Sequence, residues 1–328
     1  MPTSSEFKGV GFLSEDTYGD ILKANMVAFV DWNMINRGGF ANVSIPSSGI
    51  YGGDKHRLRP ANDPRYNNGQ VWQAFRGNWV WQSGLSTPIQ PIHVSGVNVN
   101  GTFYPSSTTG IYSHIVDYPR GRIIFNSAIP TSSNVQAEYS YKLVNVQSAD
   151  EVPFLRVIQY DSNRPDNPMY TQTGSGDWDI MIEERGQLPM IVVSVSEDKT
   201  TKGYQLGGGS YVYCNVLFYI FDETNRFHNK FSDALTFQKE KNIFLFDTNL
   251  VARANRYPLN SYGSISSGAL TYPQMVESSG NGGFRFTDNC AGGILHIKDA
   301  EARAGEWLNN KLYYSIVKYQ TEVILTNV

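Results

Sequence analysis

The sequence predicts an α+β, β-rich fold: an N-terminal helix and antiparallel β unit, followed by a smaller α+β domain with a mostly antiparallel sheet and one packed helix. Three observations predict it. Residues 14–36 have helical spacing of apolar residues, residues 92–146 contain short runs of alternating apolar and polar residues, and residues 190–325 mix longer strand patterns with one helical stripe. At 328 residues the chain is long enough for two domains, which we place at 1–146 and 147–328.

The N-terminal helix is predicted from its ends as well as from its apolar residues. Ser14 can cap the start, acidic residues follow directly, and Gly38-Gly39 supply a left-handed stop. Apolar residues cover most of the circumference, so we expect the helix to be buried.

Residues 40–146 are predicted to form the antiparallel β unit. Turn residues dominate up to residue 86, which excludes long regular elements there. Asn100-Gly101 is a pair preferred in tight hairpins, and Pro119-Arg120-Gly121 marks another turn between two apolar runs. The run from Val135 to Leu143 alternates as in a half-buried strand.

The second domain is predicted from strands around one helix. Met190 to Val195 and Tyr211 to Phe221 are strands, separated by Gly207-Gly208-Gly209, and the second has two apolar faces, which predicts cover on both sides. A helix is expected over residues 225–241, a short strand at 243–246, a long loop at 257–283 and a closing strand at 312–325. We expect Cys290 in a Gly-rich loop and Cys214 in a strand, both as free thiols.

Composition indicates a protein that contacts other proteins. Charged residues make up 17% of the chain, below the roughly 25% of typical soluble domains, while the chain holds 20 Tyr and 17 Phe. A net charge of −3 argues against nucleic-acid binding as the main task. The N-terminus lacks a signal pattern and no stretch suits a membrane span, so we expect folding in a cytoplasm.

Catalytic and cofactor motifs are not apparent. The five histidines are scattered without metal-ligand spacing, the glycine run lacks the Lys-Ser/Thr of a phosphate loop, and no nucleophile motif occurs. Asp177-Trp178-Asp179 with Glu183-Glu184 is the best acidic cluster. It leaves open a calcium site or the carboxylate pair of a glycosidase, beside a turn that begins a helix. We expect no catalytic residue, no cofactor and no metal.

Three of the six tryptophans, Trp72, Trp79 and Trp81, lie close together in the loop-rich stretch. Flat aromatic rings beside polar residues can stack on sugars, so they are a candidate contact for a glycan or a partner. The competing interpretation, which we favour, is a local hydrophobic core.

Several segments together resemble a virion structural protein of tailed bacteriophages, of the cyanophage and marine phage type. They are Gly69-Gln70-Val71-Trp72, the residues 78–84, Asp117-Tyr118-Pro119-Arg120-Gly121 with the following strand, and residues 137–142. Residues 147–328 are similar to tail-terminator or neck proteins, although compact terminators have no counterpart of residues 1–146.

The resemblance implies assembly without catalysis. A homo-oligomeric ring, as a hexamer, would cap the tail tube and contact tube and sheath proteins and the head-side connector or stopper, with DNA passing through the lumen in weak contact. The protein would then be located in the virion tail or neck. We expect the subunit interface to include Tyr211, Tyr213, Tyr219, Tyr313 and Tyr319.

Two alternatives remain at this point. The first is a fibre, collar or baseplate component that binds other virion proteins or host glycans through the tryptophans. The second is a glycosidase that uses Asp177 with Glu183 or Glu184.

Overall fold

The computed structural model describes residues 12–46, 55–151, 187–203, 209–288, 290–304 and 312–326. Its fold is mixed and β-rich with antiparallel sheets and few helices, which confirms the predicted class. The chain forms two compact units. Unit 1 comprises Met1–Asp31, Asn145–Ala254 and Tyr272–Val328, and unit 2 comprises Trp32–Val144 and Asn255–Thr271. The chain passes from unit 2 to unit 1 between residues 144 and 145, two residues before the domain boundary expected after 146. Each unit also holds one segment from beyond this boundary: residues 1–31 belong to unit 1, and residues 255–271 belong to unit 2.

The helix α1 (Tyr18–Asn36) has no exposed residue, as its apolar pattern predicts. It begins after Thr17, not at Ser14, because the Asp20 side chain reaches back to the Thr17 backbone N–H and hydroxyl. It ends in a Schellman motif: Gly38, at φ +82°, donates to the Ile35 carbonyl, and Gly39 donates to the Met34 carbonyl.

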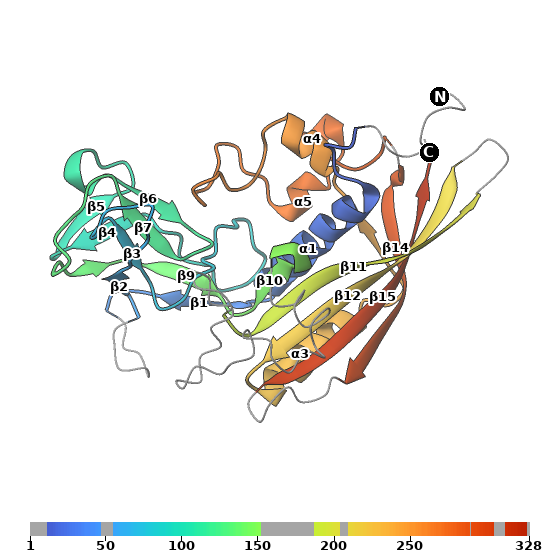
Figure 1. Cartoon of the computed structure of the whole chain (residues 1–328), viewed down its shortest axis with the longest axis horizontal. Coiled ribbons are helices and arrows are strands. Elements are labelled where there is room, and N and C mark those ends of the chain that lie inside the picture. The colour runs from blue at the N-terminus through green and yellow to red at the C-terminus, as the bar shows by residue number, and fades with distance from the viewer. Residues whose placement is uncertain are drawn as a thin grey trace. The chain divides into compact units, whose positions relative to one another are not determined.

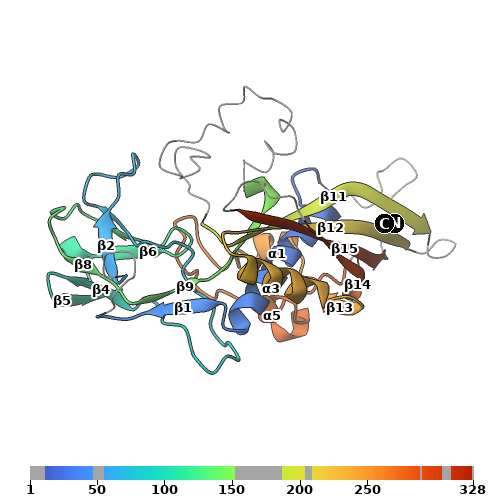
Figure 2. The same cartoon turned by 90° about the horizontal axis from the view of Figure 1, so that it is seen from below.

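Unit 1 is built around a six-stranded sheet in the order β10-β11-β12-β15-β14-β13. Its strands are β10 (Asn145–Ser148), β11 (Met190–Gly203), β12 (Ser210–Asp222), β13 (Lys241–Phe244), β14 (Cys290–Ala304) and β15 (Tyr313–Leu325). All pairs are antiparallel except β10 with β11. Helices α1 and α3 (Asn225–Thr236) lie on the same side of the four long strands (Figures 1 and 2). Short helices α4 (Thr248–Arg253) and α5 (Tyr272–Met275) complete the unit.

Three sequence expectations for unit 1 were wrong. The long loop expected at 257–283 contains helix α5. Strand β14 was missed, and Cys290 begins it instead of lying in a loop, because its second half alternates charged residues with alanines and has little apolar signal. Strand β12 is also not covered on both sides. Its even-numbered residues from Val212 to Ile220 are buried, whereas the odd-numbered residues from Tyr211 to Tyr219 are only half-buried.

Unit 2 is an antiparallel β unit around one aromatic core. Its seven-stranded sheet has the order β5-β4-β8-β2-β3-β7-β6, and a separate pair joins β1 to β9. Their bounds are as follows: β1 (Phe40–Val43), β2 (Arg57–Pro60), β3 (Val71–Gln73), β4 (Gly96–Val99), β5 (Thr102–Pro105), β6 (His114–Asp117), β7 (Arg122–Phe125), β8 (Val135–Gln136) and β9 (Tyr139–Lys142). The Asn100-Gly101 hairpin joins β4 to β5, as predicted, with both residues at positive φ.

Candidate functional surface

The side of the unit 1 sheet that faces away from α1 and α3 carries a patch of half-buried aromatic and aliphatic side chains. We call this surface, formed by alternate residues of β12 and β15, the outer face. Its aromatic and aliphatic members are Tyr211, Tyr213, Leu217, Tyr219, Tyr314, Ile316 and Ile324. Strand alternation produces it, since the residues between them point to the helix-covered side and are buried.

Aromatic contacts order the outer face along the strands. The rings of Tyr211 and Tyr213 stack with centroids 6.3 Å apart, and Tyr219 stacks on Tyr314 across the strands at 6.4 Å. Lys202 and Lys298 lie over the Tyr213 ring, at 5.5 and 6.0 Å from its centroid. The face is therefore apolar in its rings and carries charges of both signs around Tyr213, where Glu322 lies opposite it in the ladder, a mixture that suits protein contacts.

The five tyrosines predicted for a subunit interface lie on two different sides of the unit 1 sheet. Tyr211, Tyr213 and Tyr219 lie on the outer face. Tyr319 is fully buried and donates a 2.7 Å hydrogen bond to the Leu235 carbonyl of α3, so it is removed from the candidate contacts. Tyr313 lies near the His228 ring of α3, with centroids 6.1 Å apart, and belongs to the helix-covered side.

Tyr314 is the outer-face aromatic that the sequence prediction did not choose. The alternation of the closing strand was visible, but it does not say which of its two faces the helices cover. Burial raises the pKa of Tyr314 to about 12, with the nearby Tyr219 as a smaller cause.

The three tryptophans belong to the core of unit 2. Trp72 and Trp79 are each 1% exposed, and Trp81 packs partly buried against the same cluster. Trp79 stacks on Tyr139 at 4.4 Å, and the indole N–H groups of Trp72 and Trp79 donate to backbone carbonyls. A sugar needs an exposed ring face, which Trp72 and Trp79 do not offer, so this structure removes them as a glycan platform.

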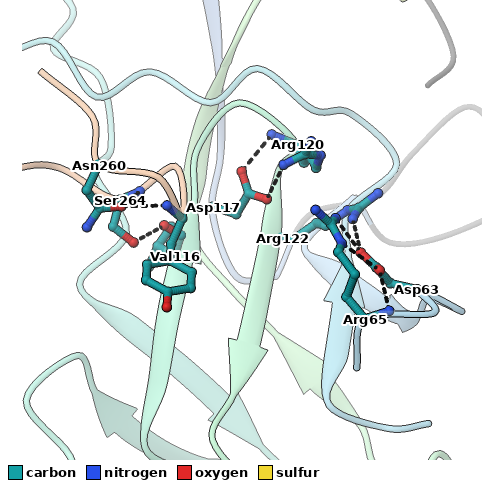
Figure 3. A network of polar contacts seen from close by, with 9 residues as sticks. Asp63, Arg65, Val116, Asp117, Arg120, Arg122, Asn260 and Ser264 are labelled. Atoms are coloured by element: carbon teal, nitrogen blue, oxygen red, sulfur yellow. Dashed lines mark hydrogen bonds and ion pairs between the residues drawn. The ribbon is translucent and has the colours of Figure 1, made fainter. Parts of the chain in front are cut away.

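The carboxylate of Asp63 is held inside unit 2 by two arginines (Figure 3). It accepts hydrogen bonds from Nε and Nη2 of Arg65 at 3.0 and 2.7 Å, and from Nη1 of Arg122 at 3.1 Å. These contacts, the Arg65 hydrogen bonds foremost, hold the pKa of Asp63 far below its usual range. The site is saturated with internal donors and fastens the loop after β2 to β7.

A second buried carboxylate, Asp117, organises the turn between β6 and β7. Its Oδ1 accepts from the Arg120 backbone N–H at 3.2 Å, and burial raises its pKa against the effect of that bond and of the arginines. Beside it, the Tyr118 N–H donates to the Gly263 carbonyl. The Ser264 hydroxyl donates to the Val116 carbonyl (Figure 3). Residues 255–271 are thereby attached to the β6–β7 hairpin.

Metal-ligating side chains do not cluster in the part of the chain that the structure describes. No group of three His, Cys, Asp or Glu side chains there could hold a metal ion. The acidic cluster of Asp177, Asp179, Glu183 and Glu184 lies outside the described residues. No helix in the described ranges is long and apolar enough to cross a membrane.

Both cysteines are buried free thiols. Burial raises the pKa of Cys214, and it raises the pKa of Cys290 to about 11. A thiol with a raised pKa is a weak nucleophile near neutral pH because little thiolate forms.

In comparisons with known proteins, no family model and no curated protein matches the chain.

Proposed function

We propose that this chain is a non-enzymatic structural protein of a tailed-phage virion, most like a tail terminator or neck protein, which assembles with copies of itself into a ring between tail tube and head connector. The virion and the role in the neck come from the sequence resemblance. The assembly role has support from the outer face of unit 1.

The outer face carries the proposal. Aromatic and aliphatic side chains stay half-buried along two adjacent strands of 13 residues each, on a sheet whose opposite side is already covered by α1 and α3. At one end of the face, Tyr219 and Tyr314 pack against a buried cluster of the same chain, formed by Met190, Val192 and Phe221. The proposal therefore depends most on the part around Tyr211 and Tyr213. Stacked tyrosines supply large contact area at a low cost in side-chain entropy. An ordered patch of this kind on a regular sheet fits a surface that another protein covers.

Unit 2 supports a structural role in a different way. Its tryptophans fill the core, and its carboxylates Asp63 and Asp117 are engaged with arginines of the same unit. These side chains are committed to holding loops and strands together. We infer that unit 2 is an added module that contacts a neighbouring virion component such as sheath or collar.

Mass photometry and negative-stain imaging of the purified protein test the proposal. Rings of about six subunits are expected, as heterologous contacts that close give cyclic symmetry. Ile316→Asp places a charge within the outer face and is expected to abolish binding to isolated tail tubes. Phe103→Asp, at an exposed phenylalanine of unit 2, is the matched control and is expected to leave it unchanged.

Each outcome discriminates. A chain that stays monomeric at every concentration and with tail tubes present contradicts the proposal, and thin trimers indicate a fibre instead. Polysaccharide cleavage lost in Asp177→Ala or Glu184→Ala would indicate a glycosidase.

A further inference from the structure

We propose that the unit 1 sheet continues from one copy of the chain into the next, through antiparallel pairing of residues 199–203 of β11 with residues 300–304 of β14 of a second copy. This inference rests on the proposed self-assembly. It names the two edges that meet and their register.

The two outermost strands of the sheet are much shorter than their neighbours. Strand β10 pairs with β11 only from Met190 to Val193, and β13 pairs with β14 only from Ile294 to Ile297. A β-bulge follows each covered part, between Val195 and Lys199 in β11 and between Ile297 and Asp299 in β14. Beyond the bulges, the described residues include no strand that pairs with the outward edges of β11 and β14.

The two free edges match in length and direction. Residues 199–203 pair regularly with β12, and residues 299–304 pair regularly with β15, so each offers a straight segment of five or six residues. Strands β11 and β14 flank the central pair β12 and β15, and they run in opposite directions (Figure 1). Copies placed side by side in the same orientation would therefore form an antiparallel pair, which uses well-aligned hydrogen bonds.

The charges of the two edges favour unlike pairing. The segment 199–203 holds Lys199 and Lys202 and no acid, a charge of +2, whereas 300–304 holds Glu301 and Arg303, a charge of 0, and the adjoining Asp299 is ion-paired with Lys239 at 3.0 Å. Two β11 edges together would confront four lysines. Pairing of β11 with β14 avoids this repulsion and allows Lys202 to lie opposite an acidic residue of β14, so the lysines disfavour a two-fold symmetric contact of β11 with β11.

Side-chain alternation selects the register. Thr201 lies opposite Val212 and Ala302 opposite Val317, both buried residues, so Thr201 and Ala302 point to the helix-covered side. Setting Thr201 against Ala302 keeps this alternation across copies and pairs all five residues from 199 to 203. It also puts Lys202 directly opposite Glu301, on the outer side of the sheet.

The free edges lie at opposite ends of the sheet along the strands. Residue Gly203 pairs with Ser210 at the start of β12, and Ala304 pairs with Ser315 near the start of β15. Each copy must then be displaced along the strand direction relative to its neighbour. In a closed assembly such a displacement is accommodated by tilting the strands against the axis.

Disulfide trapping tests the register. Directly opposite residues of antiparallel strands have Cα atoms about 4.5–5.5 Å apart, within reach of a disulfide. In the double variant Thr201→Cys/Ala302→Cys, mild oxidation is expected to link copies into a ladder of oligomers on a denaturing gel. The matched variant Thr200→Cys/Ala302→Cys is expected to give no ladder, because Thr200 points to the outer side.

Two further variants test the charges without thiols. Lys202→Glu or Glu301→Lys alone is expected to raise the concentration of half-assembly about tenfold, and the two together to restore it to within about threefold. Both side chains are exposed, so folding should be unaffected, which circular dichroism checks.

The outcomes separate this inference from the proposed function. Rings that form without a ladder in the first double variant overturn the edge pairing and leave the proposed function standing. Linked dimers from Thr201→Cys alone or Ala302→Cys alone show like edges meeting and also overturn it. A wild-type chain that never assembles removes both proposals.

Discussion

Asn25 of α1 and Phe246, in the loop after β13, exchange two hydrogen bonds at the centre of unit 1. The Asn25 side-chain amide donates to the Phe246 carbonyl at 2.8 Å, and its oxygen accepts from the Phe246 N–H at 2.8 Å. Asn25 is fully buried. Its amide thus serves the loop as a neighbouring strand would, which satisfies both backbone groups away from water.

Asn25→Leu is therefore expected to destabilise the fold by about 3 kcal/mol, since it strands a buried N–H and a buried carbonyl. Urea unfolding followed by circular dichroism measures the change. Asn281→Leu is the control, because Asn281 is exposed in a short turn, and its change should stay within about 0.5 kcal/mol. Equal losses in the two variants would contradict the role given to Asn25.

The Asp63 site predicts a loss of stability in acid. The folded pKa of Asp63 is lowered, so the carboxylate stabilises the fold at every pH above the unfolded value of about 4, and this stabilisation is lost as pH falls below it. Asp63→Asn is expected to cost about 2 kcal/mol at pH 7 and to flatten the dependence of unfolding free energy on pH between about 2 and 4.

Asp117→Asn is the contrasting variant for this pH series. The folded pKa of Asp117 is raised, so its ionisation disfavours the fold and protonation relieves that cost as pH falls through the raised pKa. The free energy of unfolding of Asp117→Asn should therefore fall more steeply in acid than that of the wild type, whereas that of Asp63→Asn should fall less steeply. Parallel pH profiles for both variants would show that the two carboxylates do not differ in this way.

Gly263→Ala is expected to loosen residues 255–271 from the β6–β7 hairpin. Gly263 has φ +77°, and a Cβ there would lie 2.5 Å from Oδ1 of Asp117. Gly101→Ala is the control, because Gly101 has φ +86° and open space around its Cβ position. We expect about 1 kcal/mol for Gly101→Ala from the backbone alone and about 3 kcal/mol for Gly263→Ala.

Limited proteolysis supplies a second measurement for the same pair. Cleavage within residues 255–271 should speed up in Gly263→Ala and remain unchanged in Gly101→Ala. Unchanged cleavage in both would mean that the contact to Asp117 does not hold this segment.

The native thiols are expected to resist maleimide at pH 8. Cys290, with a pKa of about 11, holds about one thiolate in a thousand at that pH, and both sulfurs are buried. Mass spectrometry should find no label in the folded chain and two labels in urea. Rapid labelling of the folded chain would contradict the burial of β12 and β14.

Apolar periodicity predicted those elements whose side chains alternate strongly. The strand at Tyr211–Phe221 and the helix ending at Gly38-Gly39 were predicted correctly because strand packing produces an alternating apolar pattern and helix capping requires glycines at the helix end. The second half of β14 was missed because Ala300, Ala302 and Ala304 give no such mark, and its strand character comes from the ladder with β15. Which side of that sheet the helices cover is a tertiary property, so Tyr319 was assigned to the wrong side.

Unit 2 is made of two segments that lie far apart in the sequence, so the ribosome completes one long before the other. Residues 32–144 leave the ribosome more than a hundred residues before 255–271, which carry the Gly263 carbonyl that the Tyr118 N–H uses and the Ser264 hydroxyl that bonds to Val116. Until that segment emerges, these backbone groups of the hairpin stay solvated. Unit 2 can therefore complete its fold only after residues 255–271 have been synthesised, and a fragment that ends at residue 144 would lack this segment of unit 2.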